Sequence, residues 1–450
     1  MKISSVVDIE SFNFFFAIAF AYCYYVFVLG GEPLPIPTIS KTWTFKPSNF
    51  LSRFVIVSGS LVLIVVHFAI YEKTKEYKYS SILLLMAVVA SLSLAVVGAV
   101  CADNSSPECL SSNLLHVEFA IVYFVLIDAW MIGMESTVGK SASKIRILVL
   151  LISLASKTRY ALSLQGLNLS YFSLGAFEWA NVASILIFMR SFVLEFLPDM
   201  KIGVLSNQNG PREVQTNTKV FLSFSNASIT ILSLGLAICT MGLAYLIAET
   251  RGDFEPFPHI PQISDLFVLP PGNSIARLFG VWGCTLLAII FSQFYFAYSR
   301  WTWFPFGAFF ISMLSTVFLS FSLCISKVED NSMHFFCVSG FFALLQIFAI
   351  WISFITETGK ELPSTKIWMS LPCTISMIAK SRFLIYTLEQ FAILELIDVL
   401  SMIFFIGAFA WFQFESLESK PFALFETTRS QTVICDLVEK LVDSETPAEV

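Results

Sequence analysis

The chain has 450 residues, of which 56% are hydrophobic and 13% charged, and its mean hydropathy is +0.76. Soluble domains carry roughly 25% charged residues, so this composition excludes a protein that folds mainly in water. The net charge is −6, part of which comes from an excess of acidic residues at 415–450, and the chain has no basic tract, so we expect no nucleic-acid partner.

Apolar runs follow one another along almost the whole chain, each with the length of roughly 20 residues that crosses a hydrocarbon core. In a bilayer every backbone N–H and C=O must be paired within its own segment, so each run is predicted to be an α-helix. The sequence therefore predicts an all-α polytopic membrane protein with about twelve transmembrane helices, at residues 12–30, 53–71, 80–101, 115–134, 145–162, 171–193, 223–247, 276–297, 302–325, 334–356, 367–384 and 386–412.

The first span begins close to the N-terminus. No positively charged segment precedes it and no cleavage motif follows it, so we expect a retained span rather than a signal peptide. Lysine and arginine stay preferentially on the cytoplasmic side of a membrane. Lys73, Lys75 and Lys78 follow the second span, and Lys140 and Lys144 follow the fourth. Both termini are therefore predicted to be cytoplasmic.

The loops on the lumenal face carry two kinds of candidate modification. Asn104 and Asn168 each begin an Asn-X-Ser sequon and are candidates for N-glycosylation. Cys101 and Cys109 flank the polar stretch 102–108 and are candidates for a disulfide in an oxidising lumen. The alternative is that they stay reduced, because the nine cysteines are an odd number and most lie within apolar runs.

The two halves of the chain repeat one another. Pro37-Thr-Ile-Ser40 matches Pro261-Gln-Ile-Ser264 at an offset of 224 (264 − 40), and the later Pro47, Asn49 and Arg53 match Pro271, Asn273 and Arg277 at the same offset. Each unit holds six spans, so the second inserts with the orientation of the first, as a parallel repeat. The predicted domains are a first unit at 1–198, a cytoplasmic linker at 199–219, a second unit at 220–414 and an acidic cytoplasmic tail at 415–450.

Polar residues repeated between the units all fall at the lumenal ends of helices or in lumenal loops. A cationic cluster at this depth would attract a lipid headgroup, because arginine offers a planar fork of donors and lysine a point charge. The predicted headgroup-binding residues are Ser40, Arg53, Lys157, Arg159 and Glu178, with Ser264, Arg277, Lys380, Arg382 and Glu395 in the second unit; His116 and His334 are the catalytic candidates.

Each of these residues has an alternative structural role. Basic side chains near helix ends commonly extend to the interface without a ligand, and Pro-X-Ile-Ser can simply shape a loop. Glu178 lies inside an apolar span, where an ionised carboxylate is costly, so a partner such as Arg53 or Lys157 is expected. Asp128, near the middle of the fourth span, is expected to form an interhelical hydrogen bond.

Motifs of soluble enzymes are absent. The sequence has no GxSxG elbow, P-loop, HExxH or CxxC knuckle. Its four histidines do not suggest a metal site, and we expect neither a metal nor a cofactor. A serine nucleophile would require Ser40 to lie beside His116.

The Pro-X-Ile-Ser loop with its later proline, His116 with Ala120 one turn on, and Glu178 at the start of the sixth span are similar to motifs of the FRAG/DRAM/SFK superfamily. That superfamily consists of six-span membrane proteins and includes the post-GPI-attachment-to-proteins factor 2 branch, whose N-terminal domain is of the CWH type. The resemblance covers both halves of the chain, although Val338 stands where the second unit would have the alanine. It implies two tandem six-helix units.

The resemblance implies GPI-anchor lipid remodelling at the lumenal leaflet of the Golgi or endoplasmic reticulum, with membrane lipids and GPI-anchored proteins as partners. Other branches imply a non-enzymatic regulator of autophagy, or of phosphoinositides or lipid asymmetry, at the lysosome or plasma membrane; the acidic tail would then recruit cytoplasmic partners. A transporter is the third hypothesis, because two parallel six-span halves also occur in large carriers. The sequence leaves open whether the protein is an enzyme.

Overall fold

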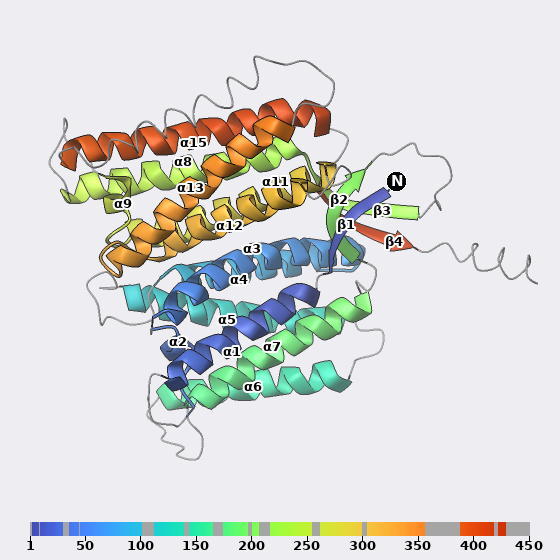
Figure 1. The fold of residues 1–450 in the computed structure, drawn as a ribbon. Helices are drawn as coiled ribbons and strands as arrows, with labels where there is room; N and C mark the ends of the chain where they lie inside the picture. The colour runs from blue at the N-terminus through green and yellow to red at the C-terminus, as the bar shows by residue number, and fades with distance from the viewer. Residues whose placement is uncertain are drawn as a thin grey trace, which may run out of the picture.

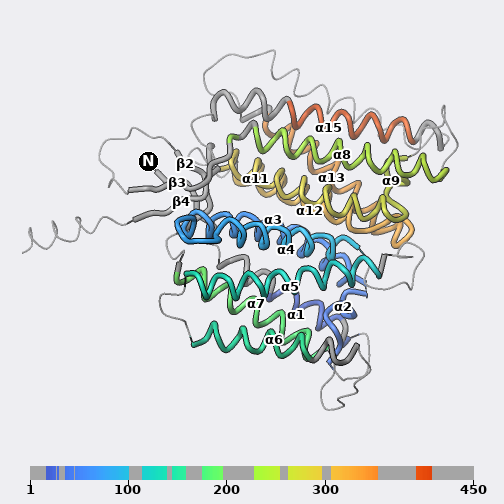
Figure 2. Tube along the Cα trace, turned by 180° about the vertical axis from the view of Figure 1, so that it is seen from behind, coloured from blue at the N-terminus to red at the C-terminus, as the bar shows by residue number. Residues whose placement is uncertain are grey.

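The computed structural model describes residues 2–8, 10–29, 36–44, 46–100, 112–138, 144–164, 174–196, 200–206, 217–253, 262–298, 304–355, 388–417 and 422–428. Two bundles of long helices lie side by side, with a small sheet at one end (Figures 1 and 2). The first bundle contains α1 (Glu10–Leu29), α2 (Ile39–Thr42), α3 (Ser48–Thr74), α4 (Ser80–Ala99), α5 (Ser112–Val138), α6 (Lys144–Leu164) and α7 (Leu174–Phe196). The second contains α8 (Asn226–Arg251), α9 (Ile263–Leu266), α10 (Gly272–Ile275), the π-helical turn η2 (Ala276–Gly280), α11 (Val281–Tyr298), α12 (Phe304–Cys324), α13 (Asn331–Ile355) and α15 (Leu388–Leu417).

These helices agree with the predicted membrane spans. Eight helices among the described residues are long and apolar enough to cross a membrane. Eleven of the twelve predicted spans coincide with helices, and the span at 367–384 lies outside the described residues. Large apolar side chains such as Leu85, Leu148 and Ile231 are more than half exposed, as expected of surfaces that face lipid. The chain is thus a polytopic helical membrane protein.

The sheet was not predicted from the sequence. Strands β1 (Lys2–Asp8), β2 (Met200–Ser206), β3 (Asn217–Phe224) and β4 (Phe422–Thr428) pair antiparallel in the order β1-β2-β4-β3. The prediction of an all-α chain therefore holds for the membrane part and fails for these segments. The strands come from the N-terminus, from the predicted linker and its edge, and from the predicted tail. These three parts of the chain therefore meet at one end of the bundles (Figure 1).

Each bundle has its own hydrophobic core. In the first, Trp130 stacks edge-on against Phe188 and lies close to Phe192, all three almost fully buried. In the second, the rings of Phe291 and Phe348 pack edge to face with centroids 4.8 Å apart. Separate cores are expected if each repeat is a packing unit.

The bundles meet along α3, η2, α11 and α12. Val57 of α3 packs with Val281 of α11, its repeat mate, in a buried cluster. The indole nitrogen of Trp282 donates a hydrogen bond of 2.9 Å to the carbonyl oxygen of Val57. The contact of equivalent positions indicates that the two units face one another across an approximate two-fold relation.

Helix starts fix the positions of the site residues. The Thr38 hydroxyl accepts a hydrogen bond of 3.1 Å from the Lys41 backbone N–H and caps α2, which carries Ser40. Asp330 accepts one of 3.0 Å from the Met333 N–H and caps α13. His334 therefore lies in the first turn of α13, close to the membrane interface.

Candidate functional site

A glutamate from the last helix of each unit binds the backbone at the start of a short helix. In the first unit, Glu178 of α7 accepts hydrogen bonds from the Ile39 N–H (3.2 Å) and the Ser40 hydroxyl (3.3 Å). In the second, Glu395 of α15 accepts from the N–H groups of Ile263 (3.0 Å) and Ser264 (3.2 Å). The three residues of each unit thus take equivalent positions, as the repeat predicts.

The predicted partner of Glu178 was wrong. A basic residue, Arg53 or Lys157, was expected to offset burial of the carboxylate. The structure instead provides a backbone N–H and a hydroxyl group, which stabilise a carboxylate by direct hydrogen bonds at a helix N-terminus.

The first unit joins its histidine to this glutamate through Ser40. His116 Nε2 lies 3.2 Å from the Ser40 hydroxyl oxygen, and Nδ1 lies 3.1 Å from the Val97 carbonyl oxygen. A carbonyl oxygen only accepts hydrogen bonds, so Nδ1 carries a proton. The Ser40 hydroxyl has one proton, which it can donate to either His116 or Glu178. It therefore bonds both residues only if a further proton lies on His116 Nε2 or on the carboxyl group of Glu178.

This arrangement is not a hydrolase triad. In a Ser-His-Asp triad the acid holds Nδ1 of the imidazole. Here Val97 holds Nδ1, and Glu178 contacts the serine instead. Ser40 does lie beside His116, as a serine nucleophile would require, but the acid that would orient the imidazole in a triad contacts the serine instead.

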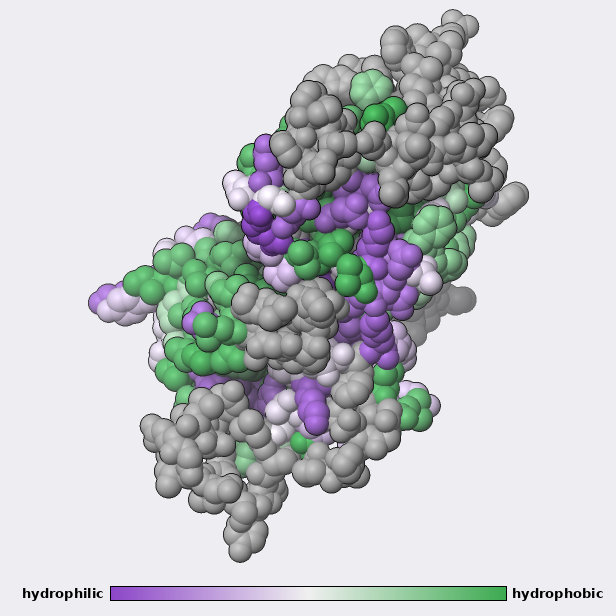
Figure 3. Space-filling view, turned by 90° about the vertical axis from the view of Figure 1, so that its left-hand side faces the viewer, coloured by the Kyte–Doolittle hydropathy of each residue, from purple (hydrophilic) through white to green (hydrophobic). Residues whose placement is uncertain are grey.

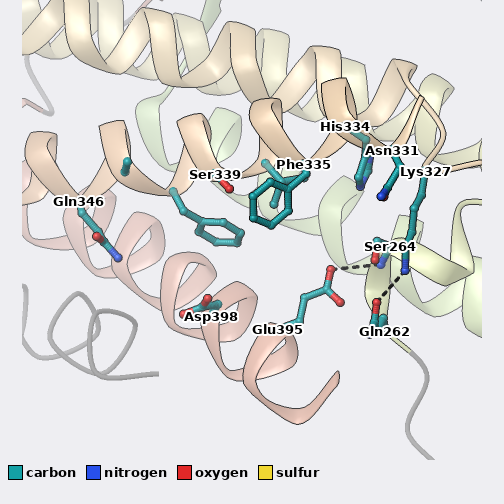
Figure 4. A pocket seen from close by; sticks show the side chains of 13 residues that line it. Gln262, Ser264, Lys327, Asn331, His334, Phe335, Ser339, Gln346, Glu395 and Asp398 are labelled. Atoms are coloured by element: carbon teal, nitrogen blue, oxygen red, sulfur yellow. Dashed lines mark hydrogen bonds between the residues drawn. The ribbon is translucent and has the colours of Figure 1, made fainter. Parts of the chain in front are cut away.

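The second unit repeats the anchoring of the imidazole but leaves its other nitrogen open. His334 Nδ1 lies 3.1 Å from the carbonyl oxygen of Ser322 and 2.7 Å from that of Ile325, as His116 Nδ1 lies near that of Val97. His334 Nε2 is buried and has no hydrogen-bond partner among the described residues. Ser264 donates its backbone N–H to Glu395 (Figure 4).

Cavities adjoin both groups. In the first unit a cavity of about 90 Å³ is lined by Ser40, His116 and Glu178 together with apolar side chains. In the second, a cavity of about 170 Å³ is lined by equivalent positions, among them Ser264, His334 and Glu395. A further cavity of about 540 Å³ shares these three residues and extends between α13 and α15 (Figure 4). Only the last has the size of ordinary ligand pockets, roughly 300–1,000 Å³.

Two of the predicted arginines, Arg53 and Arg277, lie apart from these groups, at the junction of the units. Glu329, in the turn between α12 and α13, accepts a hydrogen bond of 2.8 Å from Arg53 Nη1, and its Oε2 lies 3.3 Å from Arg277 Nη2. Arg53 also donates to the Cys324 carbonyl oxygen (2.8 Å), and Asn49 donates to Glu329 (2.9 Å). The junction is therefore a buried ionic cluster that ties one unit to the other.

Burial alone would raise the pKa of Glu329. The charges of Arg53 and Arg277, together with the hydrogen bond from Arg53, outweigh that effect and hold the pKa below its ordinary value. The carboxylate is thus ionised at neutral pH. Glu329 was not singled out in the sequence, because it has no repeat mate and follows a span in an ordinary turn.

Lys157 lies deeper in the first unit and bonds Asp128. Its ammonium group also donates to the Phe124 carbonyl oxygen (2.8 Å). The Ser153 hydroxyl oxygen lies 2.9 Å from Asp128 Oδ1 and 2.8 Å from Asn181 Oδ1, and its one proton can be donated to either oxygen. The predicted interhelical role of Asp128 is confirmed, since its partners lie on α6. Lys157 is accordingly a partner of this cluster rather than of Glu178.

Several predicted residues cannot be placed. Lys380, Arg382, Cys101, Cys109, Asn104 and Asn168 lie outside the described residues, and Arg159 is described only as part of helix α6.

All placed groups except the Asp128 cluster gather near one end of the bundles, opposite the sheet. The short helices α2 and α9 mark this end in both views (Figures 1 and 2). Seen from this end, a band of hydrophilic residues runs between apolar surfaces (Figure 3). The common face of these residues was the central expectation from the sequence.

Fold and site together define a polytopic helical membrane protein with two helix bundles and polar groups near one end of them. No protein-family model, curated protein or solved structure matches the chain. The resemblance to the FRAG/DRAM/SFK superfamily therefore stays a prediction.

Proposed function

We propose that this protein binds membrane lipid in its second unit, with the lipid headgroup at the Ser264, His334 and Glu395 group and the apolar chain between α13 and α15. The observation that carries the proposal is the 540 Å³ cavity, which joins these polar side chains to apolar ones such as Phe335, Val338 and Phe342. An amphiphile has the same division into a polar and an apolar part.

The first unit supports the assignment by contrast. The Ser40, His116 and Glu178 group lines a cavity of about 90 Å³, which corresponds to the second unit's cavity of about 170 Å³ and is about half its volume. The histidine of the first unit is already bonded at both nitrogens. The first unit is therefore proposed to stabilise the second unit rather than to bind lipid itself.

Lipid binding at one face agrees with the GPI-anchor remodelling implied by the sequence resemblance, and we propose that task as the specific function. Such a protein would act in the Golgi or endoplasmic reticulum, on lipids of the lumenal leaflet.

Two measurements test the proposal at its two levels. Native mass spectrometry of the purified full-length chain is expected to show bound lipid that Val338→Trp displaces, because Val338 lines both second-unit cavities. Absence of bound lipid would reject lipid binding. Lipid analysis of GPI-anchored proteins after gene deletion is expected to show altered acyl chains; unchanged chains would reject the remodelling task alone.

A further inference from the structure

The open nitrogen of His334 specifies the kind of headgroup that the cavity accepts. His334 is 9% exposed and lines the cavity between α13 and α15. Its Nδ1 faces two carbonyl oxygens and must carry the proton, so the neutral imidazole presents a lone pair at Nε2. A buried acceptor without a partner is costly, and a ligand that donates a hydrogen bond would remove that cost.

The other polar groups of the described lining also favour a donor. Glu395 contributes a carboxyl group on α15. A carboxylate has about four acceptor positions, of which the backbone N–H groups of Ile263 and Ser264 occupy two in Glu395. Acceptors therefore face the cavity from both α13 and α15, as Figure 4 shows.

Positive charge in the described lining is already engaged. Lys327 is its one basic residue, and its ammonium group lies 2.9 Å from Gln262 Oε1 and 3.0 Å from Asp265 Oδ1. Arg277, predicted to hold a headgroup, is instead bound to Glu329 at the junction. A phosphate at His334 Nε2 would place acceptor oxygens against the imidazole lone pair and against the carboxylate of Glu395, and like charges in a site of low dielectric repel strongly.

We infer that the second-unit cavity selects an uncharged amphiphile whose headgroup is a hydroxyl, which donates its hydrogen bond to His334 Nε2 and lies beside Glu395. This inference rests on the proposed lipid binding and narrows it. Acylglycerols and sterols share the required chemistry, a hydroxyl group on a large apolar body. Phosphatidic acid, with the same acyl chains as diacylglycerol and a phosphate in place of the hydroxyl, is the anionic counterpart.

The test uses the full-length protein in phosphatidylcholine nanodiscs and three photoactivatable probes: diacylglycerol, a sterol and phosphatidic acid. We expect diacylglycerol or the sterol to label α13 or α15, with phosphatidic acid at least tenfold weaker. The stronger of the two uncharged probes identifies the source of the hydroxyl group. Equal or stronger labelling by phosphatidic acid at this site would overturn the hydroxyl inference and leave lipid binding intact.

Substitutions at the histidine link selectivity to Nε2. His334→Asn places an amide donor near the two carbonyl oxygens and removes the acceptor at Nε2. We expect the uncharged probes to bind about tenfold more weakly, which corresponds to the loss of roughly one buried hydrogen bond. His334→Gln restores a polar atom near Nε2 and is expected to recover most of that loss. His116→Asn is the matched control, because its repeat-equivalent nitrogen is bonded to Ser40, and less than a twofold change is expected.

The outcomes separate the two proposals. Unchanged diacylglycerol and sterol binding in His334→Asn would overturn the hydroxyl inference. If that variant does not fold, Val338→Trp supplies the same test, because it fills the space beside His334; uncharged probes that still label there would overturn the inference. Failure of all three probes to bind would reject the proposed function itself.

Discussion

At the residue scale, the glycine at position 175 explains how the first unit closes around its histidine. A Cβ on Gly175 would lie 2.2 Å from the carbonyl oxygen of Ile36 and 2.4 Å from that of Pro37. The loop before Ser40 can therefore approach α7 closely, and Trp179 holds it there with a hydrogen bond of 2.9 Å to Pro37. The equivalent positions in the second unit are alanine and leucine, at residues 392 and 396, and there the serine does not bond the histidine.

Gly175→Ala is predicted to destabilise the protein by about 1–3 kcal/mol, the usual cost of overpacking a close contact. The clash involves backbone atoms, which cannot rotate away. Thermal unfolding in detergent measures the effect. Gly235→Ala is the control, because no atom lies within 4 Å of its added Cβ; it sits inside α8 and is expected to stabilise by about 0.5–1 kcal/mol. Equal stability of Gly175→Ala and wild type would refute this account of the loop.

At the scale of elements, polar contacts within the membrane region hold α5, α6 and α7 together. Asp128 of α5 contacts Lys157 and Ser153 of α6, and Ser153 in turn reaches Asn181 of α7. Arg146 of α6, fully buried, pairs with Glu135 of α5 at 2.6 Å and with Glu195 of α7. Apolar packing between helices gains little in lipid, where the surroundings are equally apolar, so such contacts specify which helices are neighbours.

Asp128→Asn and Lys157→Met are predicted to show a coupling free energy of about 0.5–3 kcal/mol in a double-mutant cycle. Each single substitution leaves a polar partner unpaired inside the bundle, whereas the double substitution removes both. Unfolding free energies of the four proteins give the coupling. Glu72→Gln and Lys75→Met, an exposed pair 2.8 Å apart on α3 and just beyond it, should couple by less than about 0.5 kcal/mol. Additive effects at Asp128 and Lys157 would contradict the proposed tie between α5 and α6.

At the scale of the whole molecule, Glu329 and the two arginines fasten the units to each other. Glu329→Gln is predicted to destabilise by about 3–5 kcal/mol at neutral pH, because two buried guanidinium groups lose their counter-charge. Asp253→Asn, whose pair with Arg251 is 31% exposed on each side, should cost less than about 1 kcal/mol.

The effect of Glu329 also has a defined pH dependence. Its pKa is lowered in the folded protein from the ordinary value of 4.5, so its contribution is complete above pH 4.5 and is lost as the pH falls through the lower folded value. The difference in melting temperature between wild type and Glu329→Gln should therefore shrink below pH 4.5. A difference that stays constant with pH would show that the charge of Glu329 is not what stabilises the junction.

The predicted orientation of the whole molecule can be tested by labelling single cysteines introduced into a cysteine-free background. Lys41 and Val328, both exposed, lie at the end with the polar groups, and Lys75 lies in a turn at the other end. In sealed vesicles with the cytoplasmic face outward, an impermeant thiol reagent should label Lys75→Cys directly. It should reach Lys41→Cys and Val328→Cys only after detergent is added. Labelling of Lys41→Cys and Val328→Cys from opposite sides would disprove a common face.

The sequence by itself determined the helical membrane character, most helix positions and the equivalence of Ser40, Glu178 and His116 with Ser264, Glu395 and His334. These follow from local hydropathy and from a repeat that keeps its residue types. Only the tertiary structure decided what each polar group contacts: the backbone partners of Glu178, the union of Arg53 with Arg277 through Glu329, and the strand pairing. The physical reason is that such contacts join residues more than 50 positions apart in the sequence. Differences as small as one Cβ atom or one bonded hydroxyl group decide whether a cavity is closed or open.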